Sequence, residues 1–281
     1  MPQLSHFGEK MNFLEKLKAG WEINNSLVCV GLDPDLSKIP DHIRKMDKPL
    51  FEFNRIIIDS TRDLVCAYKP QIAYYSAFGA EHELELTIEY IHKNCPDLPV
   101  ILDAKRGDIG ATAKMYAMEA FDRYKADAVT VNPYMGGDTL KPFLDREGKG
   151  VVILCRTSNP GARDLQDIKS GSDTVYRIVA KRAASEWNYN KNIMLVVGAT
   201  YPEELGEIRA ITGEIPFLVP GIGAQGGDIE KAVTHGRTPD GTGMAVNSSR
   251  GIIYAGNGKE FSTGVRKAAM DLRDEINLYR K

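Results

Sequence analysis

Residues 100–108 read VILDAKRGD, a short apolar run that ends in charged residues and a glycine. The apolar part has the length and composition of a β-strand that is buried on both faces. An amphipathic stretch over residues 110–124 follows and predicts a helix. A strand followed by a helix is the unit of a parallel α/β sheet, and the same alternation recurs along the chain.

The alternation predicts eight strands and, at residues 8–24, an extra N-terminal helix. Eight units without a low-complexity linker favour one closed (β/α)8 barrel, a TIM barrel, as a single domain over residues 1–281. An open doubly wound sheet, which more often has five or six strands, is the alternative. The strands are expected at Ser26–Gly31, Ala67–Gln71, Val100–Lys105, Ala128–Asn132, Gly150–Cys155, Met194–Gly198, Phe217–Pro220 and Gly243–Asn247, and the clearest helices at Phe51–Leu64, Glu81–Asn94, Gly110–Tyr124, Thr174–Trp187 and Pro202–Ile211.

Composition excludes several classes of function. The 36 lysines and arginines nearly balance the 38 acidic residues, and no polybasic run occurs, so we expect neither a nucleic-acid partner nor a membrane surface. The N-terminus lacks the unbroken apolar core of a signal peptide, which predicts a cytoplasmic protein. The four cysteines form no C-x-x-C pair and are predicted to be buried free thiols. The histidines form no metal-ligand cluster, so no metal site is predicted.

Charged residues stand at neighbouring strand ends, where the loops of a barrel form its active face. Asp103 and Lys105 alternate on the predicted third strand and should both point into the barrel. Two inward charges cost several kcal/mol each unless other charges compensate them. Asp33, after the first strand, and Lys69, in the second, can do so. Four such charges favour a functional centre over a buried ion pair that serves only packing.

Two further segments suggest ligand binding. The glycine-dense stretch Val219–Asp228 follows the seventh strand, and Arg250 follows the eighth, which is the usual place of a phosphate site in these barrels. A tight turn is the alternative reading of the glycines. The segment Cys155–Ala162 opens a long polar connection that runs to about Asp173, and such connections are often lids, although a mobile surface excursion has the same composition.

Together these segments resemble the orotidine 5′-phosphate decarboxylase family over nearly the whole chain. The resemblance is carried by DAKRGDIG at 103–110, SNPGA at 158–162, PGIGAQGGD at 220–228 and NSSRGI at 247–252, in the family's order. It implies decarboxylation of orotidine 5′-phosphate (OMP) to UMP and CO₂, the last step of UMP synthesis, with no cofactor and no metal.

The resemblance also implies roles for the charged residues. Lys105 would lie beside the departing carboxylate, stabilise the ring carbanion and protonate it. Asp103 would sit close to the substrate carboxylate. Lys69 and Asp33 would complete an alternating charge network and contact the ribose hydroxyls.

Asp108 has a different implied role, because in the family it reaches into the neighbouring subunit's site together with Ile109 and Thr112. The resemblance therefore implies a homodimer in which Asp108 and Thr112 serve the partner's site. Ser158 would read the pyrimidine edge. The remaining implied substrate-binding residues, chiefly for the phosphate, are Pro220, Gln225, Gly227 and Arg250.

Three other functions remain open on the residues alone. A sugar-phosphate decarboxylase or aldolase that uses Mg²⁺ needs a metal-binding carboxylate on the second strand, where this chain has Lys69. A Schiff-base aldolase would need Lys105 unprotonated, which three nearby carboxylates disfavour. A noncatalytic phosphate-binding protein would have little reason to keep costly buried charges.

The connection 235–242 departs from the family's common form by being longer and more polar. Arg237 in this connection could compete with Arg250 for the phosphate. Arg250 is preferred because it follows a strand, whereas Arg237 precedes one and should lie at the other end of the barrel.

Overall fold

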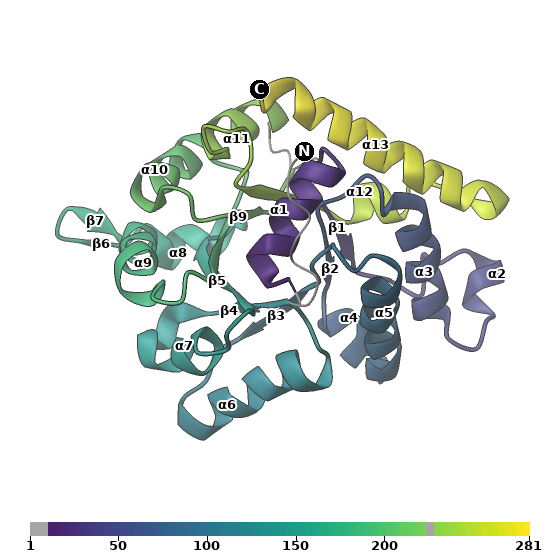
Figure 1. The fold of residues 1–281 in the computed structure, drawn as a ribbon, viewed down its shortest axis with the longest axis horizontal. Helices are drawn as coiled ribbons and strands as arrows, with labels where there is room; N and C mark the ends of the chain where they lie inside the picture. Colours follow the sequence, from purple (N-terminus) through teal and green to yellow (C-terminus); the bar gives the residue numbers. More distant parts are fainter. Residues whose placement is uncertain (1–10, 223–227) are drawn as a thin grey trace, which may run out of the picture.

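Eight parallel strands form one sheet in the computed structural model, which describes residues 11–222 and 228–281. The strand order is β2-β1-β10-β9-β8-β5-β4-β3, and bridges from Tyr68 to Val100 and from Gln71 to Asp103 join the two end strands into a barrel. The predicted TIM barrel is therefore confirmed (Figure 1). Its strands are β1 Val28–Leu32, β2 Ala67–Pro70, β3 Ile101–Arg106, β4 Ala128–Val131, β5 Gly150–Arg156, β8 Ile193–Val197, β9 Phe217–Val219 and β10 Met244–Ser248.

Helices surround the sheet, as expected for βα units (Figure 1). Two of the predicted helices end in a π-helical turn, at Glu119–Arg123 after α6 and at Ala183–Trp187 after α9. The longer helices are α3 Pro49–Thr61, α5 Glu81–Asn94, α6 Gly110–Met118, α7 Gly137–Leu144, α9 Val175–Arg182, α10 Pro202–Thr212, α11 Ile229–Gly236 and α13 Phe261–Tyr279, and the short ones are α2 Asp41–Arg44, α4 Ala73–Ser76, α8 Arg163–Gln166 and α12 Arg250–Ile253.

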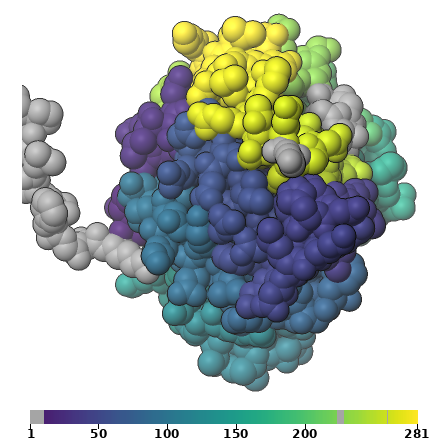
Figure 2. Space-filling view, turned by 90° about the vertical axis from the view of Figure 1, so that its right-hand side faces the viewer, coloured from purple at the N-terminus to yellow at the C-terminus, as the bar shows by residue number. Residues whose placement is uncertain are grey.

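The C-terminal helix α13 packs against α3, which lies some two hundred residues earlier in the chain. Phe261 stacks on Phe53 with ring centroids 5.0 Å apart, and Arg266 forms an ion pair with Asp63 just beyond α3. Figure 2 shows the yellow C-terminal segment directly against the blue segment that contains α3. This contact covers the outer side of β1 and β2 with two helices.

The predicted N-terminal helix is present as α1, Phe13–Ile23, and begins later than expected. Asn12 and Glu15 form a capping box that fixes its first turn, while residues 8–10 of the predicted helix lie outside the described residues. Trp21 donates a hydrogen bond from Nε1 to the carbonyl of Met244 at the start of β10, 2.8 Å away. The helix lies across the end of the barrel where the strands begin (Figure 1).

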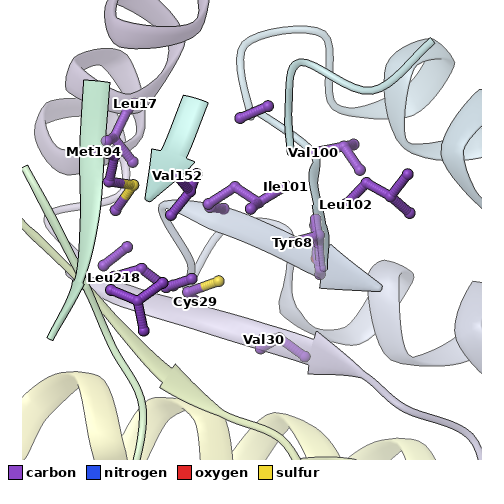
Figure 3. Packing of buried hydrophobic residues seen from close by; sticks show 14 of the residues in the cluster. Leu17, Cys29, Val30, Tyr68, Val100, Ile101, Leu102, Val152, Met194 and Leu218 are labelled. Atoms are coloured by element: carbon purple, nitrogen blue, oxygen red, sulfur yellow. The ribbon is translucent and has the colours of Figure 1, made fainter. Parts of the chain in front are cut away.

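The core lies inside the barrel and between the strands and the helices. Figure 3 shows part of it, with Ile101, Val152 and Met194 from three strands and Leu17 from α1. All four cysteines are buried and free, as predicted. None of the helices in the described part of the chain is long and apolar enough to cross a membrane.

A buried ion pair fastens α1 to the barrel. Lys16 Nζ lies 2.9 Å from Asp127 Oδ1, and both side chains are less than a tenth exposed. Asp127 Oδ2 also accepts hydrogen bonds from the Val100 amide, at 2.9 Å, and pairs with His92 Nε2 at 3.0 Å. Burial would raise the pKa of Asp127, but His92 and Lys16 outweigh burial and lower this pKa from 3.8 to about 2.

We expect Asp127→Asn to lower the free energy of unfolding by about 3 kcal/mol at pH 7, because Lys16 would stay buried without a countercharge. The pKa of Asp127 is lower in the folded state, so its contribution is present above about pH 4 and is lost as the pH falls toward 2. In urea unfolding, the free energy of unfolding of Asp127→Asn should fall short of the wild-type value by a constant amount from pH 7 to about pH 4. This deficit should shrink between pH 4 and pH 3. Asp97→Asn, at an exposed aspartate without an ion pair in the described part of the chain, is the control; an equal deficit there would contradict the prediction.

Candidate active site

Four charged side chains meet at the C-terminal ends of the first three barrel strands. Asp33 follows β1, Lys69 lies in β2, and Asp103 and Lys105 lie in β3. Lys69 Nζ is 3.1 Å from Asp103 Oδ2 and 4.0 Å from Asp33 Oδ1, and Lys105 Nζ is 2.7 Å from Asp103 Oδ1. The structure thus brings the predicted charges together in the order minus, plus, minus, plus; we call Asp33, Lys69, Asp103 and Lys105 the charge chain.

The middle of the charge chain is buried and its end is open. The Lys69 side chain is 6% exposed and that of Asp103 10%, whereas that of Lys105 is 48% exposed. Burial would raise the pKa of Asp103, but Lys69 and Lys105 hold it well below its usual range. Burial would lower the pKa of Lys69, but Asp33 and Asp103 raise it above its usual value. Asp103 and Lys69 are therefore both charged at neutral pH.

The backbone of β3 is irregular at Lys105, where regular alternation was expected, and we call this irregularity the bulge. The pairing of β3 with β4 shifts register between Leu102 and Arg106, and Lys105 has a φ of +46°, in the left-handed region that non-glycine residues rarely adopt. The two side chains still meet, but through this irregular backbone and not through a plain two-residue period. Backbone of this kind is often found at functional sites, where neighbouring groups hold it.

Thr130 of β4 holds the bulge and was missed by the sequence analysis. Its Oγ1 accepts hydrogen bonds from the amides of Ala104 and Lys105, both at 2.9 Å, and donates one to Asp103 Oδ1 at 2.8 Å. One hydroxyl therefore fixes the backbone of the bulge and one carboxylate oxygen of the charge chain. The only signal for it in the sequence is a hydroxyl residue within the apolar strand 128–131.

Ser158 follows β5 and lies against the end of β8. A side-chain carbon added at Gly198 would come within 2.9 Å of Ser158 Cβ and 3.0 Å of its amide nitrogen, so the close approach requires glycine at 198. The predicted long connection that begins here is folded, with a 3₁₀ turn at Pro160–Ala162, helix α8 and a small hairpin of β6, Lys169–Ser170, and β7, Asp173–Thr174. It is therefore not a structureless excursion.

The predicted phosphate residues are described only in part. Pro220 follows β9, while Gln225 and Gly227 lie outside the described residues. Arg250 is exposed at the start of α12, just after β10, and forms no ion pair within the described part of the chain. Near it, Asn247 Oδ1 and Ser249 Oγ are buried and have no hydrogen-bond partner among the described residues. Unsatisfied polar atoms of this kind mark a place where a ligand can bind.

Arg237 lies at the C-terminal end of α11, ahead of β10, and its Nη1 donates a long hydrogen bond to the Thr238 carbonyl, at 3.5 Å. Thr238 lies in a crevice that Trp21 of α1 also lines, at the end of the barrel where the strands begin. Arg237 and Arg250 are therefore at opposite ends of the barrel, in accordance with the preference for Arg250.

Among the described residues, Asp108, Ile109 and Thr112 do not join the charge chain. The Asp108 carboxylate accepts a hydrogen bond from the Ile109 amide at 2.8 Å, and it forms no ion pair with Lys69 or Lys105. Ile109 is 61% exposed, and Thr112 is exposed on the first turn of α6.

Residues 11–222 and 228–281 contain no group of three or more histidine, cysteine, aspartate or glutamate side chains that could hold a metal ion. A metal-dependent barrel enzyme of the alternative kind needs a carboxylate on the second strand. This chain has Lys69 there, and its ammonium group would repel a cation.

Comparisons with known proteins agree with one another. A family model described as "Orotidine 5'-phosphate decarboxylase / HUMPS family" matches residues 26–262. Proteins named orotidine 5'-phosphate decarboxylase from Dechloromonas aromatica and Cellvibrio japonicus are 57% identical over 270 residues and 56% identical over 272 residues, each covering 96% of this chain and 100% of the relative. Because the match covers most of its length and the identity is this high, the chain belongs to this family by sequence.

Solved structures give the same result for the fold. The structure of Leishmania donovani OMP decarboxylase has a TM-score of 0.83 and 39% identity, and the match covers 96% of this chain and 99% of that chain. The structure of Leishmania donovani UMP synthase has a TM-score of 0.85 and 42% identity, covering 96% of this chain and 57% of that chain. The comparisons of sequence and of fold agree, and the chain is a member of the orotidine 5′-phosphate decarboxylase / HUMPS family.

Proposed function

We propose that the chain converts OMP to UMP and CO₂ without a cofactor, with Lys105 stabilising and protonating the ring carbanion. The observation that carries this proposal is the charge chain, in which the Asp103 carboxylate lies between two ammonium groups and the Lys105 side chain is 48% exposed. Decarboxylation leaves an electron pair on an sp² ring carbon that no cofactor delocalises. A fixed cation beside that carbon is the required stabiliser.

Lys105 and Asp103 have separate parts in the reaction. Lys105 is aimed by the bulge and by Thr130 before any substrate binds, so its charge needs little reorganisation during the reaction. As the bond to the carboxylate breaks, CO₂ departs and the electron pair stays on the ring; Lys105 Nζ then transfers a proton to that carbon. Asp103 faces the substrate carboxylate, and this like-charge contact is relieved when CO₂ leaves.

The proposed binding residues surround this centre. Asp33 and Lys69 contact the ribose hydroxyls, and Ser158 reads the pyrimidine edge. The phosphate does not react, but its binding energy can be used to close the site around the ring. The residues proposed to hold it are Pro220, Gln225, Gly227 and Arg250.

The proposal includes a homodimer in which Asp108, Ile109 and Thr112 reach the partner's site. An exposed apolar surface supports it: Met115 and Met118 of α6 are 57% and 46% exposed, and Tyr134 and Met135 after β4 are 77% and 44% exposed. Met135 packs near Gly107, at the start of the segment that carries Asp108. Exposed apolar groups of this size typically mark a protein interface.

We also propose that the chain forms one domain and acts in the cytoplasm. The sheet is continuous across the chain, and four buried free thiols suit a reducing compartment.

We expect Gly198→Ala to reduce kcat/KM for OMP about tenfold, because the added methyl displaces Ser158 by a fraction of an ångström from the pyrimidine edge. Steady-state kinetics measured by the ultraviolet absorbance of OMP would show it. The control is Gly206→Ala in α10, whose added methyl would lie nearest to His235, 3.2 Å from its Cδ2. Unchanged kinetics in Gly198→Ala would show that Ser158 has no positional role.

To identify the substrate, the purified protein is incubated with OMP and, in a separate reaction, with a hexulose phosphate and Mg²⁺. We expect conversion of OMP to UMP and no aldol or decarboxylation product from the sugar phosphate. Turnover of the sugar phosphate alone would favour the metal-dependent alternative and would sink the proposal. Binding of UMP without turnover of either compound would select the noncatalytic phosphate-binding protein.

A further inference from the structure

Arg156 is a buried arginine at the end of β5, two residues before Ser158. Its side chain is 1% exposed. Its Nε and Nη2 donate hydrogen bonds to the two carboxylate oxygens of Glu204, at 2.6 and 3.0 Å, and the rings of Tyr176 and Tyr201 lie 5.1 and 5.7 Å from the guanidinium carbon. A guanidinium this deeply buried is costly unless carboxylates pair with it, so its position calls for a reason.

Arg156 also contacts the connection that carries Ser158. Its Nη1 lies 2.7 Å from Asp167 Oδ1, just after α8, although these two atoms are not aligned as a hydrogen bond. Arg156 thus joins β5, the connection 157–174 and the first turn of α10, where Glu204 lies. The pair with Glu204 is a two-bonded fork, and the pair with Asp167, whose side chain is 36% exposed, is the weaker of the two.

The contact with Asp167 bears on Ser158 through the neighbouring residues. Gln166, next to Asp167, accepts a hydrogen bond from the Thr157 amide at 2.9 Å and donates one to Thr157 Oγ1 at 2.8 Å. The end of α8 is therefore folded back on the residue that precedes Ser158. An ion pair that fixes Asp167 therefore also restricts its neighbour Gln166. The hydrogen bonds of Gln166 to Thr157 in turn restrict the backbone that leads into Ser158.

We propose that Arg156 is a positioning residue: through Asp167 it holds the connection 157–174 in place and so fixes Ser158 at the barrel mouth. The fork to Glu204 anchors the guanidinium to the barrel, and the ion pair with Asp167 transmits that anchoring to the loop. This inference rests on the proposed function, because it takes Ser158 as a contact for the substrate.

The experiment breaks the weaker pair and leaves the fork intact. Asp167→Asn should reduce kcat/KM for OMP about tenfold, mainly through KM, as expected for loss of a partly exposed ion pair that orders a binding loop. Asp164→Asn on the same helix α8, at an exposed aspartate that forms no ion pair among the described residues, is the matched control and should leave the kinetics unchanged. The melting temperature of both variants should stay within about 2 °C of the wild type.

A double-mutant cycle separates positioning from plain stabilisation. In a Ser158→Ala background, Asp167→Asn should change kcat/KM less than twofold, because the loop then has no side chain to position. Amide hydrogen exchange of residues 157–168 gives a readout that needs no turnover and should be about tenfold faster in Asp167→Asn than in Asp164→Asn.

Additive kinetic effects in the cycle, or equal hydrogen exchange in the two variants, would overturn the role of Arg156. A lower melting temperature without a kinetic change would do the same, since it would leave only a structural part for the ion pair. Absence of OMP turnover in the wild-type enzyme would instead defeat the proposed function, so the two failures are distinguishable.

Discussion

Replacing Lys105 with alanine should abolish turnover of OMP, by at least about 10⁴-fold in kcat, while UMP affinity stays within a few-fold of the wild type. Lys105 is proposed both to stabilise the carbanion and to supply its proton, and no other described ammonium group approaches the open end of the charge chain. The fold should survive, because Lys105 is half exposed and Asp103 keeps Lys69 and Thr130 as partners.

The loss in Lys105→Ala is measured by OMP absorbance at high enzyme concentration, and UMP binding by calorimetry. Lys93→Ala removes an exposed lysine from α5 that has no ion-pair partner within residues 11–222 and 228–281, and it should behave as the wild type. A residual kcat within tenfold of the wild type would assign the carbanion's stabilisation and proton to another group.

A mixture of two inactive variants, Lys105→Ala and Asp108→Ala, should regain about a quarter of the wild-type activity once their subunits exchange at equal ratio. Asp108→Ala alone should lose about 10²- to 10³-fold. In a hybrid dimer, one site combines Lys105 from one chain with Asp108 from the other and is intact, whereas the second site carries both lesions. Half of the dimers in a random mixture are hybrids.

Subunit exchange is followed by native mass spectrometry with one variant tagged, and activity is measured over the same time course. Each variant mixed with its own tagged copy is the control and should stay inactive. If Asp108 serves its own subunit, hybrid dimers contain no intact site, and full exchange without a rise in activity would show this.

The sequence predicts the barrel well because its signals are local. Each strand is a short apolar run between polar turns, and the observed strand bounds differ from the predicted ones by at most two residues; the first strand, for instance, is expected from Ser26 and begins at Val28. The charge chain was also predictable, since the C-terminal ends of parallel strands meet on one face. The beginning of α1 at Phe13 depends on the capping box formed by Asn12 and Glu15.

Other features depend on contacts between distant segments, which no local pattern contains. At the bulge, the amides of Ala104 and Lys105 donate hydrogen bonds to Thr130 Oγ1, which lies on the next strand. Arg156 meets Glu204 across 48 residues of sequence, and Lys16 meets Asp127 across 111. In each case the residue type is ordinary for its place, and only the fold shows its partner. Regular alternation was expected for β3; the side chains of Asp103 and Lys105 do meet, and the backbone between Leu102 and Arg106 departs from a regular register.

Turnover of OMP by protein stripped of metal is the most direct test of whether the charge chain decarboxylates without a cofactor. Purified protein is treated with EDTA, freed of the chelator, checked for residual metal and mixed with OMP while absorbance is followed. We predict full conversion to UMP at the rate of the untreated protein, with no gain on adding Mg²⁺. No conversion without Mg²⁺, or activity restored in proportion to added Mg²⁺, would contradict the central claim.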